Sequence, residues 1–180
     1  MRLLLIITLG FLSSISSANE NSVPEMYSLV AEENHVPAKL FYALILNESR
    51  SKTSVGVQSR VLPWPWTINH RGKPHFFPSR DQAYMFAKSL IERGDKQFDV
   101  GLGQLNWRWQ EQRFNGLWEA FDPYTNLNAA ARHLREQYNR PECNSWELAV
   151  GCYHRPGQRI QDKERARKYR ASVISLWARI

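Results

Sequence analysis

The sequence is poor in the residues that build metal centres and disulfide scaffolds. Two cysteines in 180 residues are too few for a disulfide-built fold or for a zinc site made of cysteine alone. The five histidines are scattered, and His70 and His75 flank an expected hairpin turn without an acidic or cysteine partner nearby. No Ser-His-Asp signature is readable either. We therefore predict no metal site.

Beyond the first residues, no apolar run is long enough to span a bilayer. Arg2, the apolar run Leu3–Leu12 and the small residues that end at Ala18 are typical of a secretory signal peptide cleaved after Ala18. An N-terminal membrane anchor is the alternative. We expect residues 1–18 to be removed, and residues 19–180 to form one periplasmic domain with no transmembrane segment.

Acidic residues are in the minority, with 17 Asp and Glu against 24 Lys and Arg and a net charge of +7. This excess favours an anionic partner, either a membrane surface, an acidic polymer or nucleic acid. Nucleic acid is not predicted, because the chain carries an export signal and no recognition motif. The sequence has no repeat and no low-complexity tract that would divide it into several units.

Most of the chain after residue 22 has apolar residues at helical spacing. Pro37 is expected to open a helix that runs through Asn47, and Gly94 to end one that starts at Ser79. The exception is residues 64–77, where two short extended runs around Arg71-Gly72-Lys73 predict a β-hairpin. The sequence therefore predicts a mainly α fold, with apolar helical patterns in residues 26–31, 40–45, 83–90, 127–138, 146–153 and 166–180.

Glu48 stands in an unusual place for a carboxylate. Leu40, Leu44 and Glu48 are spaced four residues apart, so they lie on one stripe of a helix and Glu48 continues an apolar face. Burial and the negative end of the helix dipole both raise the pKa of a carboxyl group. The position fits a general acid that stays protonated near neutral pH. An exposed, ionised glutamate at a frayed helix end is the alternative.

Glu48 belongs to the first of four short blocks that occur in a fixed order. Asn47–Arg50 is followed by Asp99–Asn106, Ala149–Gly157 and Lys168-Tyr169. Together these blocks resemble the soluble lytic transglycosylases, relatives of goose-type lysozyme, over nearly all of residues 19–180. The Trp64–Thr67 segment resembles small members associated with conjugation and type IV secretion. The resemblance implies a lysozyme-like helical domain.

The resemblance also suggests roles for individual residues. The catalytic Glu-Ser pair of the family matches Glu48 and Ser49, and its Gly-Leu-x-Gln block matches Gly101, Leu102 and Gln104. Gln104 suits an N-acetyl or hydroxyl group because it offers both a donor and an acceptor. A simple turn before a helix is the alternative for this glycine block. We expect Glu48 to be catalytic and the substrate to be bound by Ser49, Gly101, Gln104, Asn106, Tyr153, His154 and Tyr169.

The third block departs from the family pattern. Cys152 replaces its alanine, His154 replaces its asparagine, and Gly157 stands one position late. Tyr153 and the late tyrosine of the family, Tyr169, are kept. Core packing is the default role of both tyrosines, and the resemblance suggests that their hydroxyls also reach the cleft near Glu48. The replacement by His154 leaves the polar contact of this block open.

The resemblance implies a glycan-cleaving enzyme without a cofactor. Its substrate would be peptidoglycan, cleaved between N-acetylmuramic acid and N-acetylglucosamine with formation of 1,6-anhydromuramic acid. The wall would be opened for a conjugation or secretion apparatus, whose components would be partners. A muramidase that adds water, with Asp99 as a second carboxylate, remains an alternative, as does a non-catalytic peptidoglycan-binding assembly protein.

Two further predictions concern the cysteines and the basic residues near the C-terminus. Cys143 and Cys152 are expected to form a disulfide, because an exported chain meets an oxidising compartment and Pro141 marks a chain reversal. Two buried free thiols are the alternative. Residues 155–170 hold seven basic residues against Asp162 and Glu164. They form either a solvated helix face or a surface that attracts the carboxylates of peptidoglycan stem peptides.

Overall fold

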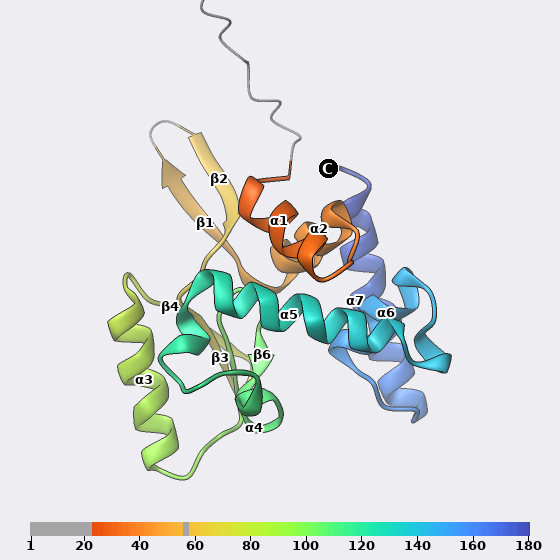
Figure 1. The fold of residues 1–180 in the computed structure, drawn as a ribbon. Helices are drawn as coiled ribbons and strands as arrows, with labels where there is room; N and C mark the ends of the chain where they lie inside the picture. The colour runs from red at the N-terminus through yellow and green to blue at the C-terminus, as the bar shows by residue number, and fades with distance from the viewer. Residues whose placement is uncertain (1–22, 56–57) are drawn as a thin grey trace, which may run out of the picture.

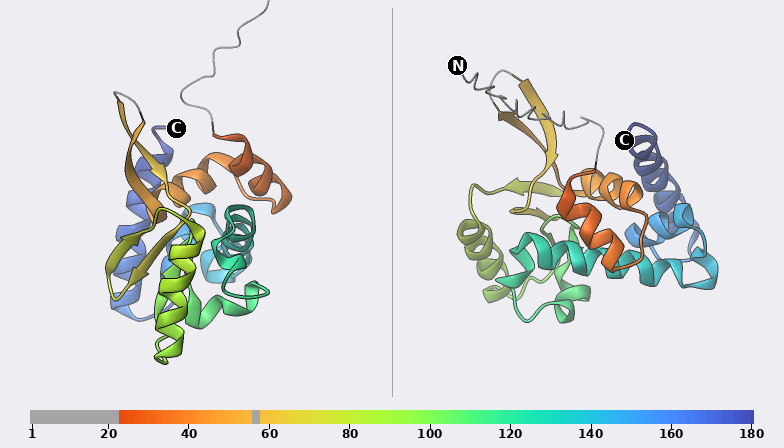
Figure 2. Two further views of the ribbon diagram at one scale, coloured as in Figure 1. Left: turned by 90° about the vertical axis from the view of Figure 1, so that its left-hand side faces the viewer. Right: turned by 45° about the horizontal axis from the view of Figure 1, so that its top comes forward.

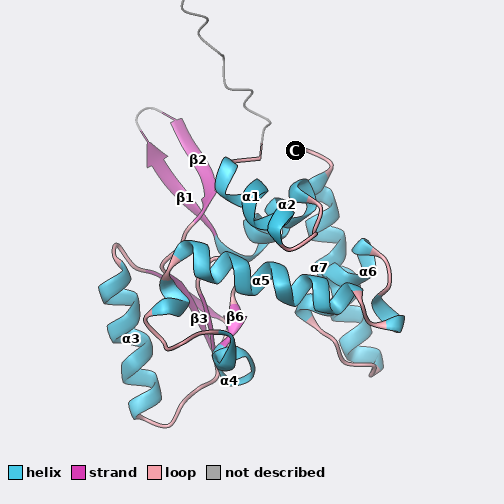
Figure 3. Cartoon of the chain, in the orientation of Figure 1, coloured by secondary structure: helices cyan, strands magenta, loops and turns pink. Residues whose placement is uncertain are grey.

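The computed structural model describes residues 23–55 and 58–180, so the predicted signal peptide at 1–18 lies outside the described residues. Helices dominate this part of the chain, and a small antiparallel sheet lies beside them (Figures 1 and 3). The predicted mainly α fold is confirmed. The helices are α1 (Glu25–Glu33), α2 (Ala38–Ser49), α3 (Arg80–Glu92), α4 (Trp107–Gln110), α5 (Pro123–Tyr138), α6 (Trp146–His154) and α7 (Ile160–Trp177).

The helix boundaries follow local capping signals. Ser79 caps α3 by accepting a hydrogen bond from the backbone N–H of Gln82, and Gly94 follows its end with a φ of +77°. α5 begins four residues before the predicted apolar pattern. Asp122 caps it by accepting a 2.9 Å hydrogen bond from the N–H of Thr125, and Pro123 occupies its first turn.

α2 is the central helix of the molecule. The sequence places Leu40, Phe41, Leu44 and Ile45 on one apolar face, and all four are fully buried. Ala43, outside that face, is also fully buried, because α1 and α7 both pack against α2. A helix enclosed in this way holds its C-terminal residues firmly, and Glu48 lies in its last turn.

The predicted β-hairpin is present, and it belongs to a larger sheet. β3 (Thr67–His70) pairs with β4 (Lys73–Phe76) in an antiparallel register that sets Thr67 opposite Phe76. β3 also pairs with β5 (Phe98–Val100), which pairs with β6 (Leu105–Asn106). The four strands follow the order β4-β3-β5-β6. β5 and β6 have only three and two residues, which is too short to show an alternation of apolar and polar residues. The sequence therefore did not predict them.

A second hairpin between α2 and β3 was also missed. β1 (Arg50–Val55) pairs with β2 (Gln58–Pro63) in an antiparallel ladder, and this two-stranded ribbon projects from the helical body (Figure 2). The sequence of β1 is almost entirely polar, so it lacks the alternation that marks a half-buried strand. Within the described residues, no helix is both long enough and apolar enough to span a lipid bilayer.

Candidate functional site

Glu48 lies where α2 meets α7. Its Oε1 accepts a hydrogen bond from the hydroxyl of Tyr169, which projects from the middle of α7. Burial raises the pKa of Glu48 to about 8, and the negative charge of Asp99 contributes to this rise. The bond from Tyr169 acts in the opposite direction, because it stabilises the ionised carboxylate. Glu48 is therefore protonated in most molecules at neutral pH.

Tyr169 is itself held by an aromatic neighbour. The ring of His154, at the end of α6, stacks on the ring of Tyr169 with centroids 4.4 Å apart and planes within 2°. Burial lowers the pKa of His154, and the charges of Arg155 and Arg165 lower it further. These effects favour the neutral form of the ring. Its stacking contact contributes to fixing the orientation of Tyr169 beside Glu48.

The glycine block forms the tight turn between β5 and β6. Gly101 has a φ of +72°, and its N–H donates a 2.9 Å hydrogen bond to the carbonyl of Thr67. A Cβ at Gly101 would lie 2.3 Å from Nδ2 of Asn126, and one at Gly103 would lie 2.5 Å from Cβ of Ala130. Both positions therefore require glycine, because the turn packs directly on α5.

Gln104 closes this turn with a φ of +45°, a conformation that non-glycine residues rarely adopt. Its Nε2 donates hydrogen bonds to the carbonyls of Gly101 at 2.8 Å and Thr67 at 3.3 Å. The predicted donor of Gln104 is thus engaged inside the protein. Among the side chains and backbone groups that the structure describes, none donates to its side-chain oxygen, so the acceptor is the half of the amide left for a ligand.

Asn106 and Asp99 face one another across β5 and β6. The Nδ2 of Asn106 donates a 2.8 Å hydrogen bond to Oδ1 of Asp99. Burial raises the pKa of Asp99, while this bond and the charge of Arg155 oppose the rise. The Oδ1 of Asn106 is buried without a hydrogen-bond partner in the described part of the chain. The negative charge of Asp99 contributes to raising the pKa of Glu48, so a second carboxylate lies close enough to influence it.

Two of the predicted ligand-binding residues donate hydrogen bonds to the backbone. The buried hydroxyl of Ser49 donates to the carbonyl of Ile45 at 3.1 Å, within α2. The hydroxyl of Tyr153 donates to the carbonyl of Gly103 at 2.6 Å, which ties α6 to the glycine turn. Tyr153 still lies near Glu48, whose charge contributes to raising the pKa of its phenol after the larger effect of burial. Both hydroxyls help to position the site, and their oxygen lone pairs can still accept a hydrogen bond from a ligand.

Asn126 is a residue of the site that sequence reasoning missed. Its Oδ1 accepts a 2.8 Å hydrogen bond from the N–H of Gly103, and its Nδ2 donates to the carbonyls of Val100 and Ala120. The side chain is almost fully buried in the first turn of α5. In the sequence, its role is indicated only by the position of an asparagine next to Leu127 on a predicted helix. This is a weak signal.

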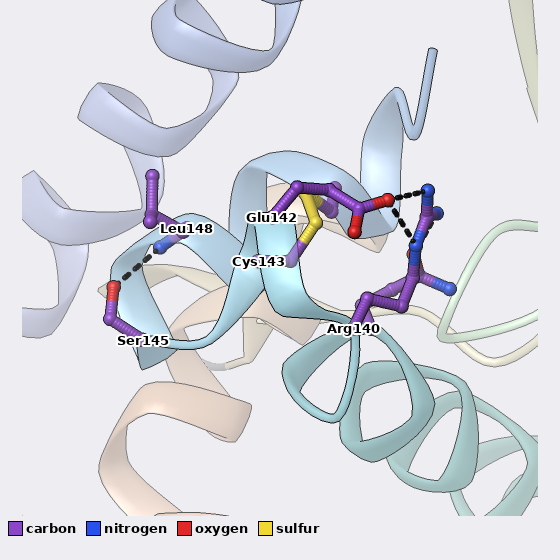
Figure 4. Close-up of a disulfide and its surroundings, with 7 residues drawn as sticks. Arg140, Glu142, Cys143, Ser145 and Leu148 are labelled. Carbon is purple, nitrogen blue, oxygen red and sulfur yellow. Dashed lines mark hydrogen bonds and ion pairs between the residues drawn. A yellow bond between two sulfur atoms is a disulfide. The ribbon is translucent and has the colours of Figure 1, made fainter. Parts of the chain in front are cut away.

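The disulfide predicted between Cys143 and Cys152 is present, with Cα atoms 6.4 Å apart. It links the 3₁₀ helix Pro141–Cys143 to α6 (Figure 4). The N–H of Leu148 donates to the hydroxyl of Ser145 at the start of the same helix. The segment that carries Tyr153 and His154 is thus fixed by a covalent bond and by a helix cap.

The expectation that His70 lacks an acidic partner is wrong. Its Nε2 lies 3.0 Å from Oδ2 of Asp95, which also accepts a 2.9 Å hydrogen bond from Arg71. Asp95 follows α3 and is 25 positions away in sequence, so no local pattern connects the two residues. Within the described ranges, no cluster of three or more His, Cys, Asp or Glu side chains is arranged to hold a metal ion.

Comparison with known families identifies one match. The model of the family described as "Transglycosylase SLT domain" matches residues 26–174, which is most of the chain and includes all four sequence blocks. The fold of this family is lysozyme-like, as the sequence predicted. The chain matches none of the curated proteins and none of the solved structures with which it was compared.

Proposed function

Because the chain belongs to the transglycosylase SLT domain family, whose members are lytic transglycosylases, we propose that it cleaves peptidoglycan between N-acetylmuramic acid and N-acetylglucosamine and forms 1,6-anhydromuramic acid. The observation that carries this proposal is the position of the Glu48 carboxyl, which accepts a hydrogen bond from Tyr169 where burial raises its pKa to about 8. A family match alone would not identify the acting group.

Glu48 acts first as a general acid. A carboxyl with a pKa of about 8 keeps its proton at neutral pH until a more basic group forms. It donates this proton to the oxygen that links the two sugars, and the bond from that oxygen to the anomeric carbon of muramic acid breaks. Glu48 is then ionised. Tyr169 stabilises this carboxylate, since its hydroxyl already donates to Oε1.

The substrate supplies the second half of the reaction. The N-acetyl oxygen stabilises the positive charge at the anomeric carbon, and the 6-hydroxyl of the same sugar then attacks that carbon. The ionised Glu48 accepts the proton of this hydroxyl and returns to its initial state. Attack within one molecule is favoured over attack by water because of its high effective concentration. No water is consumed, and no cofactor takes part.

The test is the mass of the products from purified sacculi. A muropeptide with an anhydro end is lighter by one water than the corresponding hydrolysis product. We expect the anhydro species to dominate, with wild-type protein active and a Glu48→Gln preparation inactive. A dominant species heavier by one water would contradict the proposed transglycosylase reaction.

A muramidase that adds water is the second candidate, and Asp99 is the observation that favours it. Glycoside hydrolases use a second carboxylate as nucleophile or as base for water. Asp99 lies near enough to raise the pKa of Glu48. However, Oδ1 of Asp99 already accepts the hydrogen bond from Asn106, which holds this carboxylate within the β5–β6 pair. This engagement favours the one-carboxylate mechanism.

A non-catalytic peptidoglycan-binding protein is the third candidate. A protein that only binds peptidoglycan does not need a buried carboxyl such as that of Glu48, whose burial costs stability. The presence of Glu48 therefore argues against this candidate. The loss of turbidity of a peptidoglycan suspension distinguishes the two, since a binding protein leaves turbidity unchanged and an enzyme reduces it. Glu48→Gln serves as the matched inactive control.

We further propose that the chain is exported through residues 1–18 and acts in the periplasm for a conjugation or secretion apparatus. The support for the apparatus is the resemblance of Trp64–Thr67 to such members. In the structure Trp64 donates a 2.7 Å hydrogen bond from Nε1 to the carbonyl of Phe77, next to β4. Gene deletion in the host should reduce transfer or secretion, and wild-type protein but not Glu48→Gln should restore it. The mass of periplasmic protein tests cleavage after Ala18.

A further inference from the structure

A groove of about 440 Å³ lies between α6 and α7, beside the disulfide. Its floor consists of small or apolar residues, among them Leu148, Gly151 and Ala166. The two helices touch there, because a Cβ at Gly151 would lie 3.3 Å from the carbonyl oxygen of Ala166. We call this hollow the α6–α7 groove. The reaction proposed for Glu48 makes no use of it.

The rim of the α6–α7 groove is strongly basic. Arg155, Lys163, Arg167 and Arg170 line it, together with a single acidic residue, Glu142. Glu142 is paired with Arg140 and Arg167 with Glu164, so neither is free. Lys163 and Arg170 form no ion pair with the side chains that the structure describes, and Arg155 lies within electrostatic reach of Asp99. The groove therefore presents two cations that lack a counter-charge from this part of the protein, and Arg155 at its end.

The spacing of these cations indicates an extended ligand. Lys163 and Arg170 are seven residues apart on one face of α7, which separates them by about 10 Å along the helix. An apolar floor between cations placed about 10 Å apart along the helix fits a peptide with small side chains and several carboxylates.

One end of the groove adjoins the site around Glu48. Arg155 directly follows His154, whose ring stacks on Tyr169, and Tyr169 binds Glu48. The charge of Arg155 also lowers the pKa of the Asp99 carboxyl, so the two residues are near one another. A chain that branches from a sugar bound at Glu48 can therefore enter the groove at Arg155.

We propose that the α6–α7 groove binds the carboxylate-bearing stem peptide that branches from the glycan strand. The assignment rests on the proposed function, because it takes peptidoglycan as the substrate. The groove discriminates between substrates: peptide-bearing strands are held by their carboxylates at Arg155, Lys163 and Arg170, and strands without peptide bind through the sugar alone.

The test uses the double variant Lys163→Glu/Arg170→Glu and a control with the same change in net charge. The control is Lys73→Glu/Arg93→Glu, since neither residue lines the groove. Calorimetry at low salt measures binding of a sugar-free stem tetrapeptide with free carboxylates, and of the same peptide with its carboxylates amidated. We expect the groove variant to bind the free peptide about tenfold more weakly than wild type, and the control to match wild type.

The same proteins are then compared on intact sacculi and on glycan strands from which an amidase has removed the peptides. We expect the groove variant to raise KM on intact sacculi without changing kcat, and to match wild type on stripped strands. Equal KM values for variant and control on intact sacculi would overturn the proposal. So would equal binding of the free and amidated peptides.

Two further arms separate the possible failures. If wild type cleaves neither substrate, the proposed function fails, and the calorimetric comparison still decides what the groove binds. Inorganic phosphate and phosphatidylglycerol vesicles serve as other anions. The contrary outcome is that wild type binds one of these anions, and not the free peptide, while the groove variant binds neither. In that case the groove recognises an anion other than the stem peptide, and the proposal is wrong.

Discussion

The hydroxyl of Tyr169 donates a hydrogen bond to Oε1 of Glu48, which stands 121 positions earlier in the chain. The bond joins the end of α2 to the middle of α7. It opposes the rise in pKa that burial imposes on Glu48. Tyr169 therefore holds the carboxyl in one orientation and adjusts how readily it loses its proton.

Tyr169→Phe should move the alkaline limb of the pH–activity profile to higher pH, by about one unit. The phenyl ring keeps the stacking contact with His154, but the hydroxyl that stabilises the ionised Glu48 is lost. The measurement is the initial rate of sacculus cleavage between pH 5 and pH 10. Tyr138→Phe, on α5, is the matched control. An unmoved alkaline limb would show that the bond does not tune Glu48.

Glu48→Gln should reduce cleavage at least about a hundredfold, since glutamine cannot donate a proton at neutral pH. The two side chains are nearly isosteric, so the fold should be unchanged and the circular dichroism spectrum should match wild type. Glu32→Gln, on the separate helix α1, controls for the loss of one negative charge. Near-normal activity of Glu48→Gln would remove Glu48 from the catalytic role.

The same Glu48→Gln variant should be more stable than wild type in alkaline solution. The folded pKa of Glu48, about 8, lies above the unfolded value of 4.5. Between these values the folded state binds more protons than the unfolded state, so stability falls as pH rises from about 4.5 to about 8. Glutamine does not ionise and avoids this loss.

Urea unfolding at pH 5 and at pH 9 measures the effect. The variant should gain up to a few kcal/mol over wild type at pH 9, and the gain should be smaller at pH 5. Equal stability of the two proteins at both pH values would mean that Glu48 is not held in an environment that disfavours its charge.

Local patterns predicted those parts of the molecule that depend on nearby residues. Helical spacing located the six main helices, and the stripe Leu40–Leu44–Glu48 indicated a buried carboxyl. The β3–β4 hairpin followed from extended runs around a glycine turn. Each of these signals lies within about a dozen residues, so the sequence alone carries it.

The parts that the sequence did not predict depend on contacts between distant segments. Asn126 supports the glycine turn from a helix 23 positions after Gly103, and Asp95 reaches His70 across 25 positions. The hydroxyl of Tyr153 donates to the carbonyl of Gly103, 50 positions earlier in the chain. No periodicity or motif encodes such pairs, because they arise only when the elements pack.

Loss of the Cys143–Cys152 disulfide should lower the free energy of unfolding by about 2–3 kcal/mol, as expected for a short closed loop in the chain-entropy model. Cys143→Ala/Cys152→Ala and the reduced wild-type protein should both show this loss in urea unfolding. Thiol counting under denaturing, non-reducing conditions provides the control. Two free thiols in the purified protein would refute the bridge.

Asp99→Asn tests whether Glu48 acts without a second carboxylate. Asparagine keeps an oxygen that can accept the hydrogen bond from Asn106, so the β5–β6 pairing should survive. The substitution removes a negative charge that raises the pKa of Glu48, so the alkaline limb of the pH profile should move to lower pH. Asp95→Asn, whose carboxylate contacts His70 and Arg71, removes an equal charge away from this pair.

The two mechanisms differ in what Asp99→Asn leaves behind. In a hydrolase that depends on Asp99 as nucleophile or base, the variant loses the step that this carboxylate performs, and the rate falls by orders of magnitude at every pH. In the transglycosylase reaction the 6-hydroxyl of the substrate performs that step. The variant should then keep its activity within about tenfold at pH 6, where Glu48 remains protonated. Its products should remain anhydro species by mass. A near-complete loss of rate in a folded variant would assign the second chemical role to Asp99.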